Sequence, residues 1–167
     1  MTSRSAVTEP RAIQDFYVDA GAICFGCGRH NPQGLGVRTH WDGVEGVCRF
    51  TPAAQHTAFP GVVYGGLLAS LIDCHSIGTA IAAMYDAEGR APGSEPEITC
   101  VTASLQVDYL KPTPMGVALE LRARIEELGG RKVIVRCSLR AAGQETVRGR
   151  VVAVRVKSRM GTGCGKD

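Results

Sequence analysis

Two glycines and one aspartate provide the groups that an attack on a carbonyl requires. Gly65 and Gly66 open a stretch with helical periodicity, and the first N–H groups of a helix have no intrahelical partner and lie at the positive end of its dipole. Glycines let a substrate approach that backbone closely, so the pair predicts an oxyanion site. Asp73 is the only charged residue in the middle of the helix and would serve as general base or nucleophile.

The spacing of these groups predicts an active site built from two chains. Asp73 lies eight residues beyond Gly65, which is about 12 Å along a helix, whereas both groups must come within about 3 Å of the reacting atoms. We therefore expect the glycine donors of one chain to act with Asp73 of another, giving two sites per dimer by symmetry. The alternatives are a plain helix start at the glycines and a solvated or hydrogen-bonded aspartate.

The helix that carries these groups has two distinct faces. The face with Asp73 otherwise holds small residues and one isoleucine, which would let two helices approach across a dimer axis: Gly66, Ala69, Ser70, Ile77 and Ala80. The broader apolar face predicts the side that packs in the core: Leu67, Leu68, Leu71, Ile72, His75, Thr79 and Ala82. We interpret His75 as a core histidine, not a catalyst.

The remaining elements follow from apolar alternation and turn signals. Residues 1–20 form an N-terminal arm with one short helix, a single domain spans 21–157, and 158–167 form a flexible tail. Loops are expected at 21–36, 55–63 and 87–97, and the helix runs from Gly65 to about Asp86. The strands are expected at 36–41, 44–51, 98–110, 116–128, 131–142 and 145–157.

This order of elements predicts an α+β domain in which a curled antiparallel sheet of about six strands wraps around one long central helix. One helix cannot cover both faces of such a sheet, so a partner chain must cover the other face or the edges. This is the arrangement of the hotdog fold, and it predicts an obligate homodimer or a homotetramer built as a dimer of dimers.

Three segments resemble the phenylacetyl-CoA-type branch of the hotdog thioesterases: 24–28 (CFGCG) together with 31–36 (NPQGLG), 60–73 (PGVVYGGLLASLID) and 101–112 (VTASLQVDYLKP). The resemblance implies hydrolysis of an acyl-CoA thioester. Asp73 takes the place of the helix carboxylate, and Gly65 and Gly66 take that of the backbone donors. Thr102 falls where the family often has a hydroxyl that helps place the attacking water. The sequence departs from the family at Tyr64, where a histidine is usual, and at Ala58, where many members have asparagine.

These departures support a second hypothesis, a non-catalytic acyl-CoA-binding or regulatory hotdog protein. Four further residues are candidates for substrate binding, each with a structural alternative. Tyr64 either packs or donates its hydroxyl in the pocket, and His56 either shapes the pocket mouth or is a solvated loop residue. Lys111 either meets the CoA phosphates or is a solvated charge, and Ser70 belongs to the small-residue face beside Asp73.

The seven cysteines are odd in number and scattered, so no disulfide framework is expected. Cys24-x-x-Cys27 followed by His30 is reminiscent of zinc sites, but the sequence offers no evident fourth ligand and no second such pair. We therefore expect neither a metal nor a cofactor, and a small zinc protein with a hotdog-like sheet is left as a third hypothesis.

Composition excludes several classes of protein. With 167 residues, 44% hydrophobic and 21% charged, the chain suits one globular domain. The net charge of +3 comes without a dense basic stripe, so no nucleic acid is expected. No run of about 20 apolar residues and no apolar N-terminal segment is evident, so we expect no membrane partner and a cytoplasmic location.

Overall fold

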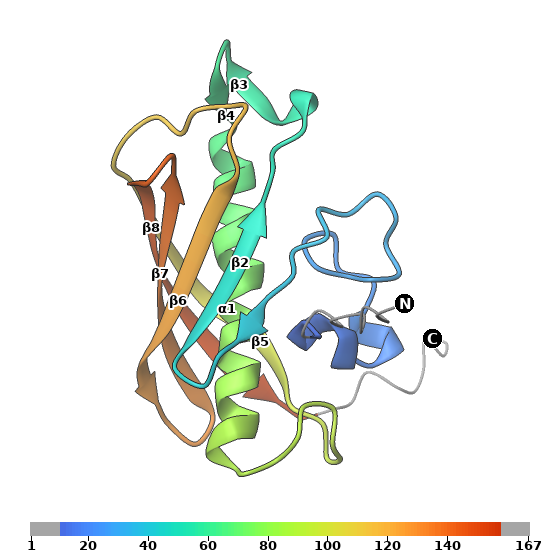
Figure 1. The fold of residues 1–167 in the computed structure, drawn as a ribbon. Helices are drawn as coiled ribbons and strands as arrows, with labels where there is room; N and C mark the ends of the chain where they lie inside the picture. The colour runs from blue at the N-terminus through green and yellow to red at the C-terminus, as the bar shows by residue number, and fades with distance from the viewer. Residues whose placement is uncertain (1–10, 158–167) are drawn as a thin grey trace, which may run out of the picture.

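The computed structural model describes residues 11–157 and contains a six-stranded antiparallel sheet in the order β1-β2-β6-β7-β8-β5 (Figure 1). β6, β7 and β8 form a meander, and β5 returns to pair with β8 at the edge. The bounds are β1 (His40–Trp41), β2 (Glu45–Phe50), β5 (Thr99–Tyr109), β6 (Leu119–Leu128), β7 (Lys132–Ala141) and β8 (Gln144–Val156). The predicted α+β architecture is confirmed.

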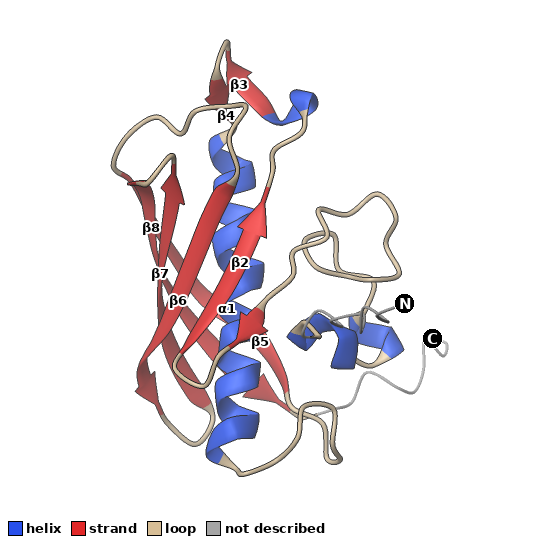
Figure 2. Cartoon of the chain, viewed as in Figure 1, coloured by secondary structure: helices blue, strands red, loops and turns tan. Residues whose placement is uncertain are grey.

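The helix α1 (Gly65–Ala87) runs along one face of this sheet (Figure 2). Its predicted apolar face is buried, with Leu71 and Ile72 fully shielded from solvent. The contact is close because Gly149 on β8 has no side chain: a Cβ there would lie 2.3 Å from Ile72 Cγ2. By length and hydropathy α1 could cross a membrane, but 72% of its most apolar 18-residue window is buried here, as in the core helix of a folded domain.

His75 is a satisfied core residue, as its place on the apolar face predicted. Its Nε2–H donates to the carbonyl of Gly46 (3.1 Å), so its Nδ1 accepts from the hydroxyl of Thr39 (2.9 Å). Thr39 in turn accepts a hydrogen bond from Gln14 Nε2. Burial lowers the pKa of His75 to about 4, so this buried chain of hydrogen bonds holds a neutral ring and ties the N-terminal segment to α1.

The N-terminal segment lies beside α1 (Figure 1). It contains two short 3-10 helices, η1 (Ile13–Phe16) and η2 (Asp19–Gly21), and irregular chain up to β1. Ile13 and Gln14 are buried against the domain, so the described part of the predicted arm is packed. The predicted tail, 158–167, and the first ten residues lie outside the described residues.

The structure differs from the predicted elements in three places. The N-terminal arm contains two short 3-10 helices where one helix was expected. The expected loop over 55–63 holds a 3-10 turn, η3 (Ala54–His56), and a small hairpin of β3 (Thr57–Phe59) and β4 (Val62–Val63). The expected first strand shortens to His40–Trp41, because residues 37–39 instead hydrogen-bond to the N-terminal segment: Val37 N–H to Gly26 O and Thr39 to Ile13 and Gln14.

The strand β5 is an edge strand with unusual apolar exposure. Val101 (40% exposed), Leu105 (39%) and Tyr109 (54%) all reach solvent. The predicted small-residue face of α1 is also half-exposed from Gly66 to Ile77, although Ala80 at its far end is buried. In one chain, therefore, an unpaired strand edge and an uncovered helix face both remain open, a combination typical of protein interfaces.

Candidate active site

Asp73 and Thr102 meet across the junction of α1 and β5. The Thr102 hydroxyl donates to Asp73 Oδ1 over 2.5 Å, although the residues are 29 positions apart. The pairing of β5 with β8 shifts register immediately after Thr102, between this residue and Ser104, and such irregularities change the direction in which strand side chains point. The carboxylate is half-buried, so it is positioned by the fold and still accessible to a small molecule.

This pair lines a cavity of about 350 Å³. One wall is α1, a second is the start of β5, and the third is the N-terminal segment. Apart from the polar pair, the walls are largely apolar, with contributions from Ile13, Phe16, Tyr17, Ile77, Ile81 and Val101. A space of this volume is at the small end of ligand pockets, and its chemistry suits an apolar group with a reactive end at Asp73.

The predicted oxyanion donors lie at the N-terminal end of α1. Within residues 11–157, neither the Gly65 N–H nor the Gly66 N–H has an acceptor, whereas their carbonyls accept hydrogen bonds from Tyr109 Oη (2.8 Å) and Ser70 Oγ (2.9 Å). The ring of Tyr64 lies against Gly66, where a Cβ would be 2.5 Å from Tyr64 Cε1. A side chain at position 66 would therefore displace the Tyr64 ring, which stands in place of the family's histidine.

The other candidates belong to the same end of the helix. His56 accepts a hydrogen bond from Ala53 N–H at its Nδ1 (3.0 Å), stacks on Phe50, and accepts the Tyr64 N–H at its carbonyl (2.9 Å). These contacts shape the approach to the helix start. Lys111 is exposed just beyond β5, with Nζ 3.5 Å from Gln144 Oε1.

The candidates thus form two groups within one chain. Asp73 and Thr102 line the cavity, whereas Gly65, Gly66, Tyr64, Ser70, His56 and Lys111 are not among the described residues that line it. The structure brings the first pair together and leaves the glycine donors apart from it, as the eight-residue spacing on a rigid helix requires.

Three cysteines gather beside Asp73, a feature that spacing did not predict. The sulfurs of Cys24, Cys27 and Cys74 all lie within 4.8 Å of one another. The hydrogen bond with Cys74 lowers the pKa of Cys27 to about 7, and the same interaction, together with burial, raises the pKa of Cys74. Cys74 was visible in the sequence only as the neighbour of Asp73. His30, in contrast, contacts Asp19 at 3.1 Å and is not part of this cluster.

Tyr17 brings a further polar group to this side of the cavity. Its hydroxyl is buried and has no hydrogen-bond partner within the described chain. Burial raises the pKa of Tyr17 well above its usual value, and the negative charge of a Cys27 thiolate adds to that rise. The hydroxyl is therefore enclosed in the neighbourhood of the thiols without a group to receive its proton.

Comparison with known proteins places this geometry in a family. The profile of the thioesterase superfamily matches residues 60–148, more than half of the chain. A solved thioesterase superfamily protein from Shewanella loihica is 45% identical, with a TM-score of 0.60, and the match covers 72% of this chain and 91% of that one. The PaaI protein of the E. coli phenylacetic acid degradation operon is 18% identical, with a TM-score of 0.60, covering 73% and 80%, and shares the fold.

Among curated proteins, the chain is similar to the acyl-coenzyme A thioesterase THEM4 of Xenopus laevis, with 30% identity over 111 residues. That match covers 66% of this chain but 44% of the relative, so the chain spans less than half the length of that protein. The superfamily profile begins just before the glycine pair and extends over both Asp73 and Thr102. With a six-stranded antiparallel sheet against one long helix, the chain belongs to the thioesterase superfamily and has its hotdog fold.

Proposed function

We propose that this protein is an acyl-CoA thioesterase in which Asp73 assists the attack of water on the thioester. The observation that carries the proposal is the Thr102–Asp73 hydrogen bond at the polar end of an apolar cavity. The acyl group occupies the cavity, and the CoA part extends toward solvent, where Lys111 meets its phosphates. The names of the curated relatives support this substrate class.

The reaction needs one proton acceptor and one oxyanion site. Asp73 takes a proton from water as the water oxygen bonds to the carbonyl carbon, and Thr102 helps to orient that water. The negative charge that develops on the carbonyl oxygen is stabilised by the N–H groups of Gly65 and Gly66. Collapse of the intermediate breaks the C–S bond, and the thiolate of CoA takes up a proton.

We further propose that two chains share each site. The axial distance of about 12 Å between the glycine pair and Asp73 prevents one helix from supplying both. The open edge of β5, with Leu105 and Tyr109 exposed, supports pairing with a second copy that would bring its glycine donors to this Asp73. The assembly is a homodimer or a dimer of such dimers.

The test is release of free thiol from short, long and aromatic acyl-CoA esters. Asp73→Asn keeps the size of the side chain and removes the base, so kcat falls by about 10²-fold to 10⁴-fold. Asp86→Asn, at the exposed end of the same helix, is the matched control and keeps full activity. Equal turnover by wild type and Asp73→Asn would refute the proposed role.

A non-catalytic acyl-CoA-binding protein is the second candidate, favoured by one observation. The ring of Tyr64 lies on Gly66, at the backbone that must receive the oxyanion. A folded dimer that binds acyl-CoA esters tightly and releases no thiol would decide for this function. In that case Tyr64→His, which restores the family's usual residue, is the variant in which turnover is expected to emerge.

A further inference from the structure

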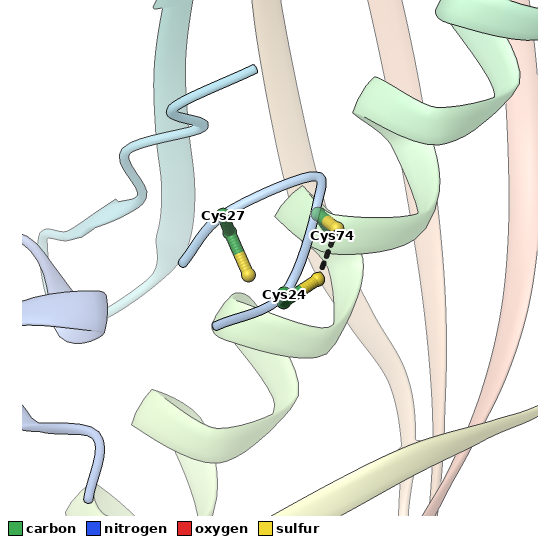
Figure 3. Close-up of side chains that lie close together, drawn as sticks. All are labelled: Cys24, Cys27 and Cys74. Carbon is green, nitrogen blue, oxygen red and sulfur yellow. Dashed lines mark hydrogen bonds between the residues drawn. The ribbon is translucent and has the colours of Figure 1, made fainter. Parts of the chain in front are cut away.

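Three cysteine sulfurs lie close enough together, all within 4.8 Å of one another, to bind one metal ion. Figure 3 shows Cys24 and Cys27 on one loop and Cys74 on α1, with their side chains converging. The Cys24 and Cys74 sulfurs are 3.9 Å apart. Two thiolates bound tetrahedrally to one zinc ion at about 2.3 Å stand about 3.8 Å apart, whereas a disulfide requires about 2.0 Å.

The loop is shaped to present its sulfurs to the helix. The Gly28 N–H donates to the Cys24 carbonyl (2.8 Å), which closes a tight turn around the Cys-x-x-Cys pair. Two glycines make this turn and its contact possible: a Cβ on Gly28 would lie 2.5 Å from Cys24 N, and a Cβ on Gly26 would lie 2.2 Å from Cys74 Sγ. The three sulfurs are therefore held together by backbone packing, not by a chance meeting of flexible side chains.

The unpartnered hydroxyl of Tyr17 is the second, independent observation. It is buried, and Tyr17 lines the same cavity as all three cysteines. A buried hydroxyl without a hydrogen-bond partner destabilises the fold, so a further polar group beside Tyr17 would relieve that destabilisation. A water molecule on a metal ion held by the thiols would provide the Tyr17 hydroxyl with a hydrogen-bond partner.

We propose that Cys24, Cys27 and Cys74 bind one Zn²⁺ ion, with a water molecule as fourth ligand that forms a hydrogen bond with the Tyr17 hydroxyl. Each thiol that becomes a ligand releases its proton. The ion joins the N-terminal segment to α1 and so fixes one wall of the cavity next to Asp73. This site does not depend on thioester hydrolysis, and its occupancy can be measured without substrate.

The experiment is titration of reduced, chelator-treated protein with Zn²⁺, followed by metal analysis after gel filtration. We expect one zinc per chain in the wild type. Cys74→Ser should weaken zinc affinity by more than about 100-fold, since even partners outside the ligand set contribute 10-fold to 100-fold. Cys48→Ala, which removes a buried thiol on β2 that does not belong to the cluster, is the matched control and should bind zinc as the wild type does.

Two further measurements keep the proposal falsifiable if Cys74→Ser fails to fold. X-ray absorption of the wild-type zinc protein should show three sulfur ligands and one lighter ligand. Tyr17→Phe keeps all three thiols and should bind zinc about 10-fold to 100-fold more weakly. Absence of zinc binding in reduced wild type, a Cys24–Cys74 disulfide that forms despite excess zinc, or equal affinity of wild type and Tyr17→Phe would each contradict the proposed site. A protein that binds zinc but does not hydrolyse acyl-CoA would contradict the proposed thioesterase function and leave the proposed zinc site standing.

Discussion

Thr102 on the edge strand β5 donates its hydroxyl hydrogen bond to the carboxylate of Asp73 on α1, at 2.5 Å. This contact ties a helix residue to a strand residue at the wall of the cavity. It fixes the direction of one carboxylate oxygen and leaves the other available to a water molecule. The orientation of the Asp73 carboxylate can therefore be tested separately from its presence, by substitution of Thr102.

Removal of the Thr102 hydroxyl should slow hydrolysis without abolishing it. A hydrogen bond to a charged group contributes about 1.5–3 kcal/mol, so Thr102→Ala is expected to lower kcat by about 10-fold to 100-fold. Thr102→Ser keeps the hydroxyl and should retain most of the activity. Steady-state assays of both variants check this, and equal losses in the two would point to packing as the role of Thr102.

The buried His75 should make the fold sensitive to acid. Its pKa is lowered to about 4 in the folded protein, compared with about 6.5 in the unfolded chain. The unfolded state therefore binds the extra proton first, so the stabilisation is complete above pH 6.5 and is lost as the pH falls toward 4. The loss is about 3 kcal/mol. Urea unfolding between pH 7 and pH 4 measures this loss. A free energy of unfolding that does not change with pH would mean that His75 takes up its proton as readily in the folded protein as in the unfolded chain.

The close contact of α1 with β8 should make Gly149 intolerant of a methyl group. Its added Cβ would lie 2.3 Å from Ile72 Cγ2, so Gly149→Ala is expected to destabilise the fold by about 1–3 kcal/mol. Gly130→Ala is the matched control, because nothing lies within 4 Å of a Cβ at that turn. Denaturant titrations compare the two, and similar free energies of unfolding would show that the helix shifts without cost.

The exposed edge of β5 should control assembly and activity together. Leu105→Asp places a charge on the strand proposed to pair with a second chain, so we expect monomers and loss of turnover by a protein whose circular dichroism is native. Leu128→Asp, on β6 and similarly exposed (45% against 39%), serves as control and should leave the assembly unchanged. Light scattering gives the mass, and an active Leu105→Asp monomer would disprove the shared site.

The sequence predicted the elements whose signals are local. The apolar face of α1 and the alternation in the last four strands predicted these elements and their order. Their boundaries differ from the prediction where tertiary contacts compete with the local pattern. Residues 37–39 have the composition of a strand, but their hydrogen bonds go to the N-terminal segment, which no periodicity reveals.

In the candidate site, too, the residues with local signals were predictable and the tertiary contacts were not. Asp73 and the glycine pair stand out by type and position on one helix, and Thr102 followed from the family resemblance. The approach of Cys74 to Cys24 joins residues 50 positions apart, and the enclosure of the Tyr17 hydroxyl depends on how the N-terminal segment folds back. Such contacts arise from tertiary packing and leave no spacing signal.

The N-terminal wall of the cavity comes from a different part of the chain than Asp73 and Thr102. Asp73 and Thr102 lie within residues 60–148, which match the family, whereas Ile13, Phe16 and Tyr17, which also line the cavity, precede that region. The dimensions of the cavity can therefore change by substitution in a short preceding segment, without any change in the residues that align the carboxylate. In the proposed thioesterase, substitutions in this segment would alter selectivity for the acyl group and leave the proposed reactive residues, Asp73 and Thr102, unchanged.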